Sequence, residues 1–245
     1  MKAMILAAGL GTRLRPLTNH LPKPLLPLEG KPLIEYTLRL LRKYAVTEVV
    51  INLHYQGDKI RQALGDGARW GMKIQYSEEP QILGTGGGIK KMARFLSDEP
   101  FLVINSDILV EIRLDRLIEF HQRQKAAATL VLREDPEVDS WGAVGIDSHH
   151  RIRQFLGKPD WKGEPLAKRM FAGIHVMDPR VLSYIPDQGF FTIIDAYVEM
   201  LRKGEPLLGH AFKDYWTDIG TPERYHNAQD DLKRKRVQLS YMDEG

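Results

Sequence analysis

The sequence predicts an α/β protein built on a doubly wound, mostly parallel sheet. Strand-like and helix-like segments alternate through the first half of the chain, which is the order found when crossover helices connect parallel strands. Two strand-like segments, 48–53 and 100–107, are nearly continuous apolar runs, as expected for strands buried on both faces. With 245 residues, the chain is long enough for one large domain with a full core.

The first half contains five expected strands separated by helices. Residues 32–44 have a helical period, because Leu33, Tyr36 and Leu40 fall on one side. Sheets of this Rossmann-like kind bind ligands outside the carboxyl ends of their strands. The expected strands are 4–8, 48–53, 73–78, 100–107 and 126–133, and the expected helices are 32–44, 57–64, 85–96 and one that includes 114–121.

The second half has shorter elements. Thr221 is suited to be an N-cap and Pro222 to be the first residue of a final helix. No hexapeptide repeat is visible, so no β-helix domain is expected. The other expected elements are strands at 142–147, 152–156, 169–177, 207–212 and 215–219 and helices at 179–185 and 193–203.

The composition excludes several classes of function. There are no cysteines, so disulfides, a thiol nucleophile and Cys-ligated metals are excluded. The net charge of +3, from 35 basic and 32 acidic residues, does not favour general nucleic-acid binding. No apolar stretch approaches the ~18–20 residues of a membrane span, and no signal peptide is expected. These features predict a cytoplasmic protein with no nucleic-acid or membrane partner.

The most informative stretch follows the first expected strand. Gly9 and Gly11 form a turn, Arg13 follows, and Lys23 lies between two prolines. A buried strand that leads into a glycine-rich loop with nearby cations is suited to hold a polyphosphate. The loop is not a Walker A sequence, and Leu14 occupies the place of the third glycine of a dinucleotide fingerprint.

The longer string, Gly9-x-Gly-Thr-Arg-x-x-Pro-Leu-Thr and then Pro-Lys-Pro, resembles the signature of the sugar-1-phosphate nucleotidylyltransferases. These enzymes join a nucleoside triphosphate to a sugar 1-phosphate and release pyrophosphate. The resemblance implies Arg13 and Lys23 as catalytic residues. It implies nucleotide-binding residues at Leu6, Ala7, Ala8, Gly9, Gly11, Thr12, Arg13, Gln81, Gly84, Thr85 and Gly86.

Two aspartates are candidate ligands of Mg²⁺. Asp107 ends a buried strand, and hard cations prefer carboxylate oxygens together with substrate phosphates. Asp218 lies in Tyr215-Trp-Thr-Asp-Ile-Gly-Thr-Pro222, which resembles the late metal-site motif of the family. More than a hundred residues separate the two aspartates, so only the resemblance implies that they meet.

The remaining sites are implied by weaker similarities. The glycine cluster Gly84–Gly88 carries a third glycine where the family usually has alanine, as in uridylyl- and heptose-type branches, and its helix N-terminus is expected to attract anions or polar edges. Gly157 replaces a glutamate before the lysine of the Glu-Lys-Pro motif. The implied sugar-phosphate-binding residues are Asn105, Trp141, Gly142, Lys158, Gly173 and Asp195.

The resemblance therefore implies a single nucleotidyltransferase domain, 1–245, with an inserted sugar-binding α/β half. The nucleotide-binding half is about 1–135, the sugar-phosphate half about 136–236, and 237–245 a tail. Mannose-1-phosphate guanylyltransferase-like and N-acetylmuramate-1-phosphate uridylyltransferase-like activities are favoured, which would serve cell-envelope polysaccharide. Heptose-1-phosphate guanylyltransferase and glucose-1-phosphate thymidylyl- or uridylyltransferase stay open, as does a homo-oligomer.

Two readings from other classes are less favoured. A GT-A-type glycosyltransferase would show an Asp-x-Asp pair, but Ser106-Asp107-Ile108 supplies one carboxylate. A non-catalytic nucleotide-sugar-binding regulator would have lost Arg13, Lys23 or Asp107, and all three are present.

Overall fold

The structure is a computed structural model that describes residues 1–242. The chain forms two compact units, which are described separately. The N-terminal unit comprises Lys2–Ile82, Ile104–Ile112 and the chain from Asp214 on, and the middle unit comprises Leu83–Val103 and Arg113–Lys213. The predicted halves, about 1–135 and 136–236, stay a prediction, because these compact units follow packing rather than nucleotide and sugar binding.

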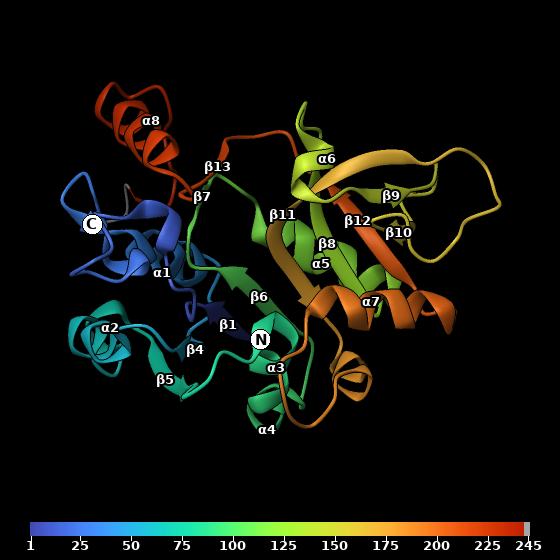
Figure 1. Ribbon diagram of the computed structural model, residues 1–245, viewed down its shortest axis with the longest axis horizontal. Coiled ribbons are helices and arrows are strands. Elements are labelled where there is room, and N and C mark those ends of the chain that lie inside the picture. Colours follow the sequence, from blue (N-terminus) through green and yellow to red (C-terminus); the bar gives the residue numbers. More distant parts are fainter. Residues whose placement is uncertain (243–245) are drawn as a thin grey trace. The chain divides into compact units, whose positions relative to one another are not determined.

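The N-terminal unit contains parallel strands with helices between them, as predicted (Figure 1). Strand β4 is paired with β1 through Met4 and Val50 and with β5 through Val50 and Gln75. The middle residues of β1 and β4 are fully buried, which explains their apolar, β-branched composition. These elements are β1 (Lys2–Leu6), α1 (Leu33–Lys43), β4 (Glu48–Leu53), α2 (Gly57–Leu64) and β5 (Lys73–Glu78).

Smaller elements complete the N-terminal unit. Strand β7 pairs with β13 in an antiparallel ladder, and helix α8 follows β13. The bounds are η1 (Thr12–Leu14), η2 (Lys23–Leu25), β2 (Pro27–Leu28), β3 (Lys31–Pro32), η3 (Ala68–Trp70), β7 (Ile108–Val110), β13 (Trp216–Asp218) and α8 (Pro222–Lys233). Thr221 caps α8 by accepting a hydrogen bond from the backbone N–H of Arg224, as its sequence position predicts.

The middle unit is a mixed sheet with helices packed on it. Strand β11 is antiparallel to β8 and β9, and β12 is parallel to β8. Helix α7 packs on β10 and β12, and α5 packs on β8 and β11. The bounds are α3 (Gly84–Lys91), α4 (Ala93–Leu96), α5 (Leu114–Gln124), β8 (Ala128–Arg133), α6 (Val138–Trp141), β9 (Val144–Ile146), β10 (Ile152–Phe155), β11 (Ala167–Met177), η4 (Pro179–Tyr184), α7 (Ile193–Arg202) and β12 (Leu207–Ala211).

Most expected elements agree with the structure to within two residues, the short elements β2, β3, β7 and α6 were not expected, and three differences affect the site. The first strand is Lys2–Leu6 rather than 4–8, because the N–H of Ala7 already bonds a side chain instead of a neighbouring strand. The expected helix 85–96 is interrupted at Met92, between α3 and α4. Strand β6 (Phe101–Asn105) ends before Asp107 and is divided between the two units.

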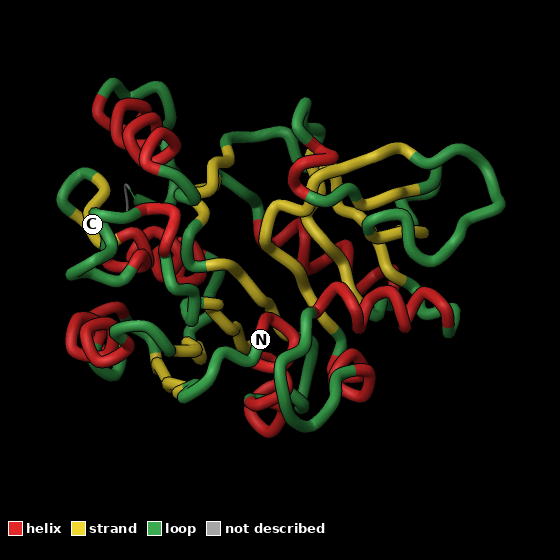
Figure 2. The backbone as a smooth tube through the Cα atoms, in the orientation of Figure 1, coloured by secondary structure: helices red, strands yellow, loops and turns green. Residues whose placement is uncertain are grey.

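Two further segments are informative. The connection between β10 and β11, residues 156–166, is a long loop without helix or strand (Figure 2). Within the expected tail, 237–245, Tyr241 is buried and its hydroxyl donates to the carbonyl of Val110 at 2.9 Å. The last three residues of that tail, 243–245, lie outside the described residues. Among the helices of the described chain, none is both long and apolar enough to cross a membrane.

Candidate active site

The loop after β1 is held open by specific contacts. The amide of Ala7 donates to the Asn52 side chain at 2.7 Å, which turns the chain out of the sheet after Leu6. Gly11 has φ +64°, and a Cβ there would lie 3.1 Å from Cγ2 of the buried Thr18. The Thr18 hydroxyl also donates to the Gly11 carbonyl at 2.8 Å. Glycine is therefore required at Gly11 by both conformation and space.

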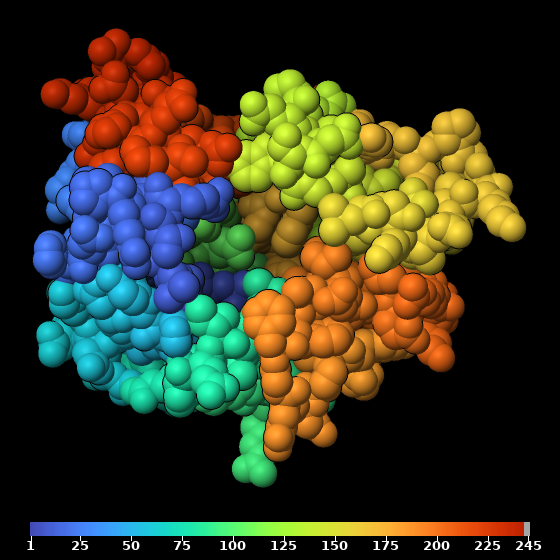
Figure 3. Space-filling model, viewed as in Figure 1, coloured from blue at the N-terminus to red at the C-terminus, as the bar shows by residue number. Residues whose placement is uncertain are grey.

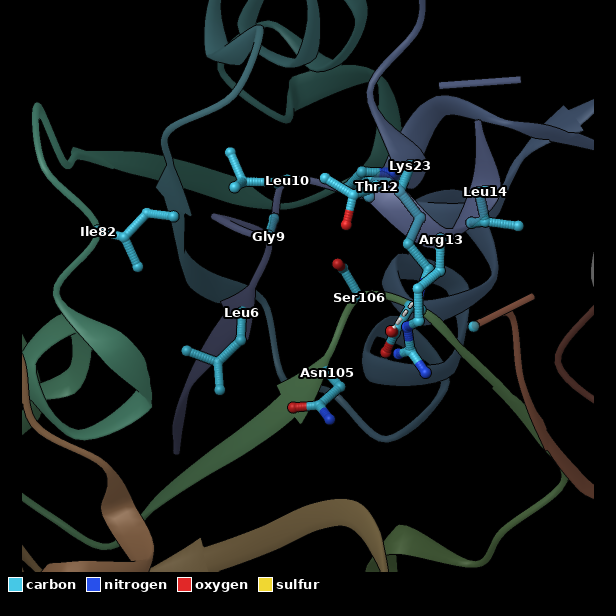
Figure 4. Close-up of a pocket in the computed structure, with 15 residues that line it drawn as sticks. Leu6, Gly9, Leu10, Thr12, Arg13, Leu14, Lys23, Ile82, Asn105 and Ser106 are labelled. Atoms are coloured by element: carbon cyan, nitrogen blue, oxygen red, sulfur yellow. Dashed lines mark hydrogen bonds and ion pairs between the residues drawn. The ribbon is translucent and has the colours of Figure 1, made fainter. Parts of the chain in front are cut away.

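A cavity of about 390 Å³ lies within the N-terminal unit, at the carboxyl end of β1. This is within the ~300–1,000 Å³ of small-molecule sites. Figure 4 shows Arg13, Asn105 and Ser106 around the same space as Gly9 and Thr12. The predicted residues that line it are Leu6, Ala7, Gly9, Gly11, Thr12, Arg13, Lys23, Asn105 and Asp107, and the sequence analysis missed Leu10, Leu14, Pro24, Ile82, Ser106 and Gly220.

The ladder between β7 and β13 brings the two predicted metal ligands together. Asp218 pairs with Ile108 in this ladder, and the N–H of Ile219 donates to the carbonyl of Asp107 at 2.7 Å. The two aspartates are thus neighbours across a two-stranded sheet, which no local pattern in the sequence could show.

Each carboxylate has a cationic partner. Lys23 forms an ion pair with Asp107, and Arg224 donates to Oδ1 of Asp218 at 2.6 Å. Burial raises the pKa of Asp218, Arg224 opposes that rise, and the charge of Asp107 adds to it. The effect of Asp107 shows that the two carboxylates interact. Arg224 was missed by the sequence analysis, because its role depends on the turn from β13 into α8.

Gly220 allows this arrangement. A Cβ at Gly220 would lie 2.3 Å from Oδ2 of Asp218 and 3.4 Å from a terminal nitrogen of Arg13. Arg13 and Asp218 therefore both approach the backbone at Gly220. Any larger residue at this position would displace the Asp218 carboxylate.

The donor set fits Mg²⁺. Mg²⁺ prefers oxygen ligands and is commonly held by one or two carboxylates plus substrate phosphates. Asp107 lines the cavity together with Arg13 and Lys23, and Asp218, which is not part of the lining, is its neighbour across the β7–β13 ladder. Across residues 1–242 no group of three or more histidines, aspartates or glutamates could form a fully protein-bound metal site. The residues therefore fit a metal whose coordination is completed by substrate.

The glycine cluster, in the middle unit, differs from its expected role. Helix α3 begins at Gly84, and the N–H groups of Gly86 and Gly87 donate to the carbonyl of Phe191 at 2.9 and 3.1 Å. These two donors of the helix N-terminus are thus bound within the chain. The expectation that this helix end attracts anions is wrong for these two groups.

The acceptor-side residues are placed by local contacts. Lys158 precedes Pro159 through a cis peptide bond, and the Gln154 side chain donates to the Pro159 carbonyl at 2.9 Å. Asp195 lies in the first turn of α7, where its carboxylate accepts from the Thr192 hydroxyl at 2.6 Å. The other predicted residues of this group in the middle unit are Trp141 at the end of α6, Gly142 after it, and Gly173 within β11.

These five residues stay predictions as substrate contacts. A second cavity of about 650 Å³ lies in the middle unit between the 156–166 loop and β9, and its lining includes none of them. Gln81 and Ala8, both in the N-terminal unit, do not line the first cavity.

Two buried histidines are structural. His121 contacts the hydroxyl of Thr129 at 3.0 Å, and burial lowers its pKa to about 4. His175 contacts the hydroxyl of Tyr197 at 2.6 Å, and burial lowers its pKa to about 3. Both imidazoles are therefore neutral near pH 7 and are bound to core side chains.

The chain matches known proteins over most of its length. It is 34% identical to a UTP–glucose-1-phosphate uridylyltransferase of Synechocystis over 93% of this chain and 62% of that protein. It is also 34% identical to a mannose-1-phosphate guanylyltransferase of Mycobacterium tuberculosis, over 95% of this chain and 64% of that protein. The chain thus spans less than two thirds of the length of these curated relatives.

The chain is also similar to solved structures. The crystal structure of HddC from Yersinia pseudotuberculosis, complexed with GMP-PN, has a TM-score of 0.76 and 26% identity over 94% of this chain and 99% of that one. The model of the nucleotidyl transferase family matches residues 2–235. The chain therefore belongs to the nucleotidyl transferase family.

Proposed function

We propose that this protein joins a nucleoside triphosphate to a sugar 1-phosphate, forming a nucleotide sugar and releasing pyrophosphate. The observation that supports this most strongly is the cavity beside β1. It combines the backbone of a glycine turn, the cations Arg13 and Lys23, and the carboxylate of Asp107, and Asp218 adds a second carboxylate beside Asp107. The names of the relatives, which act on glucose and mannose 1-phosphates, support the same class of substrates.

The reaction that fits this arrangement is an in-line displacement at the α-phosphorus. An oxygen of the sugar 1-phosphate forms a new bond to that phosphorus, while the bond from the phosphorus to the bridging β-phosphate oxygen breaks. The electron pair leaves with pyrophosphate. No general base is needed, because a phosphate monoester is largely ionised near pH 7. Catalysis then consists of positioning two anions and offsetting their charge.

Named residues have separate roles in this proposal. Arg13 binds the β- and γ-phosphates that leave, and Lys23 lies beside the α-phosphate and the attacking oxygen. Lys23 pairs with Asp107 in the free protein, so it is already held at the cavity wall by a carboxylate. Lys158 is proposed to bind the acceptor phosphate, and the backbone that carries it is held by the Gln154 side chain, which donates to the Pro159 carbonyl at 2.9 Å.

Asp107 and Asp218 would hold Mg²⁺. When bound, the cation would neutralise phosphate charge and polarise the α-phosphorus. Arg224 keeps the Asp218 carboxylate in place through its 2.6 Å contact, so the carboxylate is oriented before any ligand arrives. Orienting contacts of this kind to metal ligands commonly contribute to metal affinity.

The base and sugar are narrower proposals. Mannose-1-phosphate guanylyltransferase-like and N-acetylmuramate-1-phosphate uridylyltransferase-like activities are favoured, with glucose- and heptose-1-phosphate as alternatives. Glycine at position 86, where the family usually has alanine, does not discriminate among these. A Cβ at Gly86 would lie 3.0 Å from the Phe191 ring, so internal packing accounts for glycine there without reference to the base.

The test is pyrophosphate release with Mg²⁺, measured for five nucleoside triphosphates against a panel of sugar 1-phosphates. The proposal predicts release that requires one triphosphate and one sugar phosphate together. Lys23→Ala should lower the rate of this release by about 10²- to 10³-fold. Lys73→Ala removes the same charge from β5, outside the cavity lining, and should leave it intact.

Other outcomes would contradict the proposal. Release of a nucleoside diphosphate from a nucleotide sugar would identify a glycosyltransferase. Binding of nucleotide sugars by calorimetry without turnover of any pair would identify a regulator.

A further inference from the structure

The loop that follows β1 is pinned at both ends by side chains that lie outside the cavity lining. At its start, the N–H of Ala7 donates to Oδ1 of Asn52 at 2.7 Å. At its other end, the hydroxyl of Thr18 donates to the carbonyl of Gly11 at 2.8 Å. Asn52 is 3% exposed and Thr18 is 1% exposed, so water does not compete for either contact. The backbone between Ala7 and Gly11 is therefore fixed at two points.

Between these two points, the backbone donors of the loop are free. Within residues 1–242, the N–H groups of Gly9, Leu10 and Gly11 donate no hydrogen bond. All three residues line the cavity beside β1. Backbone N–H groups of a glycine-rich turn are suited to bind phosphate oxygens, and they do so best when the turn is already ordered. The two pinned ends supply that order.

One short segment at the end of β4 supports both ends of this loop. Asn52 holds its start, and the hydroxyl of Tyr55 donates to the carbonyl of Thr18 at 3.1 Å. In Figure 3 the blue surface of the N-terminal loops accordingly borders the cyan surface that includes α2. The position of the loop is thus set by the chain that follows the neighbouring strand.

A buried carboxylate determines which end of the Asn52 side chain faces Ala7. A carboxamide has one oxygen, which accepts hydrogen bonds, and one NH₂ group, which donates them. Nδ2 of Asn52 donates to Oε1 of Glu79 at 2.8 Å, so the oxygen of Asn52 is directed to the N–H of Ala7. Without an acceptor at Glu79, the carboxamide would be free to turn and present its NH₂ group to that N–H. Two donors cannot bond each other, so the start of the loop would lose its support.

Glu79 is itself held on both sides of its backbone. Its N–H donates to the carbonyl of Leu53 at 2.7 Å, and its carbonyl contacts Nδ1 of His54 at 2.7 Å. Because a carbonyl only accepts, this ring nitrogen must carry a proton. Glu79 is 2% exposed, and burying a carboxylate costs free energy that burying an apolar side chain does not. A buried glutamate at this position is therefore better explained by the loop that it supports than by stability.

We propose that Asn52 and Glu79 are positioning residues for the triphosphate. The inference rests on the proposed function, in which the cavity beside β1 holds the phosphates. Glu79 orients the Asn52 carboxamide, the carboxamide holds Ala7, and the free N–H groups of the loop then face the phosphate oxygens. A loop that is ordered before binding loses less conformational entropy when the ligand binds. Removing this support should therefore weaken triphosphate binding, although neither side chain touches the ligand.

Three substitutions separate the steps of this support. Asn52→Leu has a similar size but neither accepts from Ala7 nor donates to Glu79. Glu79→Met removes the acceptor that orients Asn52, whereas Glu79→Gln keeps an oxygen that can accept from it. We expect triphosphate affinity to fall about 10-fold or more in Asn52→Leu and about 3- to 10-fold in Glu79→Met. Glu79→Gln should stay within about 2-fold of the wild-type protein.

A matched control removes a buried hydrogen bond elsewhere in the same unit. Tyr36→Phe deletes the hydroxyl that donates to the carbonyl of Leu28 at 2.9 Å, and neither residue lines the cavity. This variant should have a lower urea midpoint of unfolding but unchanged triphosphate affinity. The experiment is calorimetric titration of the full chain with ATP, GTP, CTP, UTP and dTTP, each with Mg²⁺, together with urea unfolding of every variant.

Wild-type affinity in both Asn52→Leu and Glu79→Met would overturn the inference, as would an equal loss of affinity in Tyr36→Phe. A loss in Glu79→Gln as large as that in Glu79→Met would also overturn it, because an acceptor oxygen for Asn52 would then not be what matters. If Asn52→Leu does not fold, the two Glu79 variants carry the test. Wild-type protein that binds none of the five triphosphates would refute the proposed function, and the inference with it, so the two failures are distinguishable.

Discussion

The two glycine-rich segments of this protein look alike in the sequence but differ in what their glycines face. A Cβ at Gly9 would meet no atom within 4 Å, and Gly9 lines the cavity of the N-terminal unit. A Cβ at Gly84 would collide with the backbone of Phe191. The first segment leaves space that a ligand can occupy, whereas the second has its space filled by another part of the chain.

Glycine spacing therefore indicates that some group approaches the backbone closely, but not which group it is. Near Gly9, the charged side chains indicate what kind of group approaches. The cations Arg13 and Lys23 line the same cavity and would attract an anion. Near Gly84, the partner is a backbone carbonyl, and the donors that an anion would need are already bound. Substitutions in the two segments should therefore separate catalysis from stability.

The largest expected effect is on turnover in the first segment. Lys23→Ala should lower kcat by about 10²- to 10³-fold, because it removes a positioned charge from the reacting phosphates. The melting temperature should change by only a few degrees, since partly exposed ion pairs contribute ~0–1 kcal/mol. Steady-state kinetics and thermal unfolding of the same preparation check both. Near-normal turnover would remove Lys23 from the mechanism.

Alanine substitutions at Gly84 and Gly9 should affect different properties of the protein. Gly84→Ala should lower the free energy of unfolding by about 2–4 kcal/mol, because φ is +72° and the Cβ meets Phe191. Gly9→Ala should change it by less than ~0.5 kcal/mol but weaken triphosphate binding. Urea unfolding and titration with a triphosphate measure both quantities. A stability loss at Gly9 equal to that at Gly84 would refute the contrast.

Asp218→Asn should separate function from stability at the two candidate metal ligands. Since burial raises the pKa of Asp218, its ionised form is less favoured in the folded protein than in the unfolded chain. A neutral side chain should therefore leave stability at pH 7 unchanged or higher, while the Mg²⁺ concentration needed for turnover rises about 10-fold or more. Chemical unfolding and a Mg²⁺ titration are the measurements. A marked loss of stability would show that the carboxylate holds the fold.

The smallest expected effect is on the acid side of the pH profile. A carboxyl with a raised pKa takes up its proton at a higher pH than an ordinary aspartate. Activity should thus begin to fall on acidification at a pH above the 3.8 of a free aspartic acid, while the contribution of Asp218 to folding improves over the same window. Raising Mg²⁺ should shift this limb to lower pH, since metal and proton compete. If the pH of this acidic limb did not change with the Mg²⁺ concentration, a group other than Asp218 would be responsible for it.

Local patterns predicted the first sheet well. The predicted bounds of β4, α2 and β5 agree with the structure, because each element has a clear apolar period and a break at its ends. The interruption at Met92 has no proline or glycine to mark it, and the sequence could not show it.

The site was predicted in part, and what was missed depends on tertiary contacts. The cavity residues near Gly9 follow one another in the chain, so a motif can identify them. The meeting of Asp107 with Asp218 depends on the β7–β13 ladder, and the partnership of Arg224 with Asp218 depends on the turn into α8. The packing of Phe191 on Gly84 joins segments a hundred residues apart. None of these contacts leaves a local pattern.

In the proposed reaction, the cavity beside β1 directs attack on the α-phosphorus. The most direct test uses the triphosphate and sugar 1-phosphate that turn over together, with the triphosphate labelled by ³²P at either the α- or the γ-position. We expect α-label to appear in the nucleotide sugar and γ-label in pyrophosphate, and neither transfer to occur without the sugar phosphate. Recovery of γ-label in inorganic phosphate, or on the sugar, would contradict it.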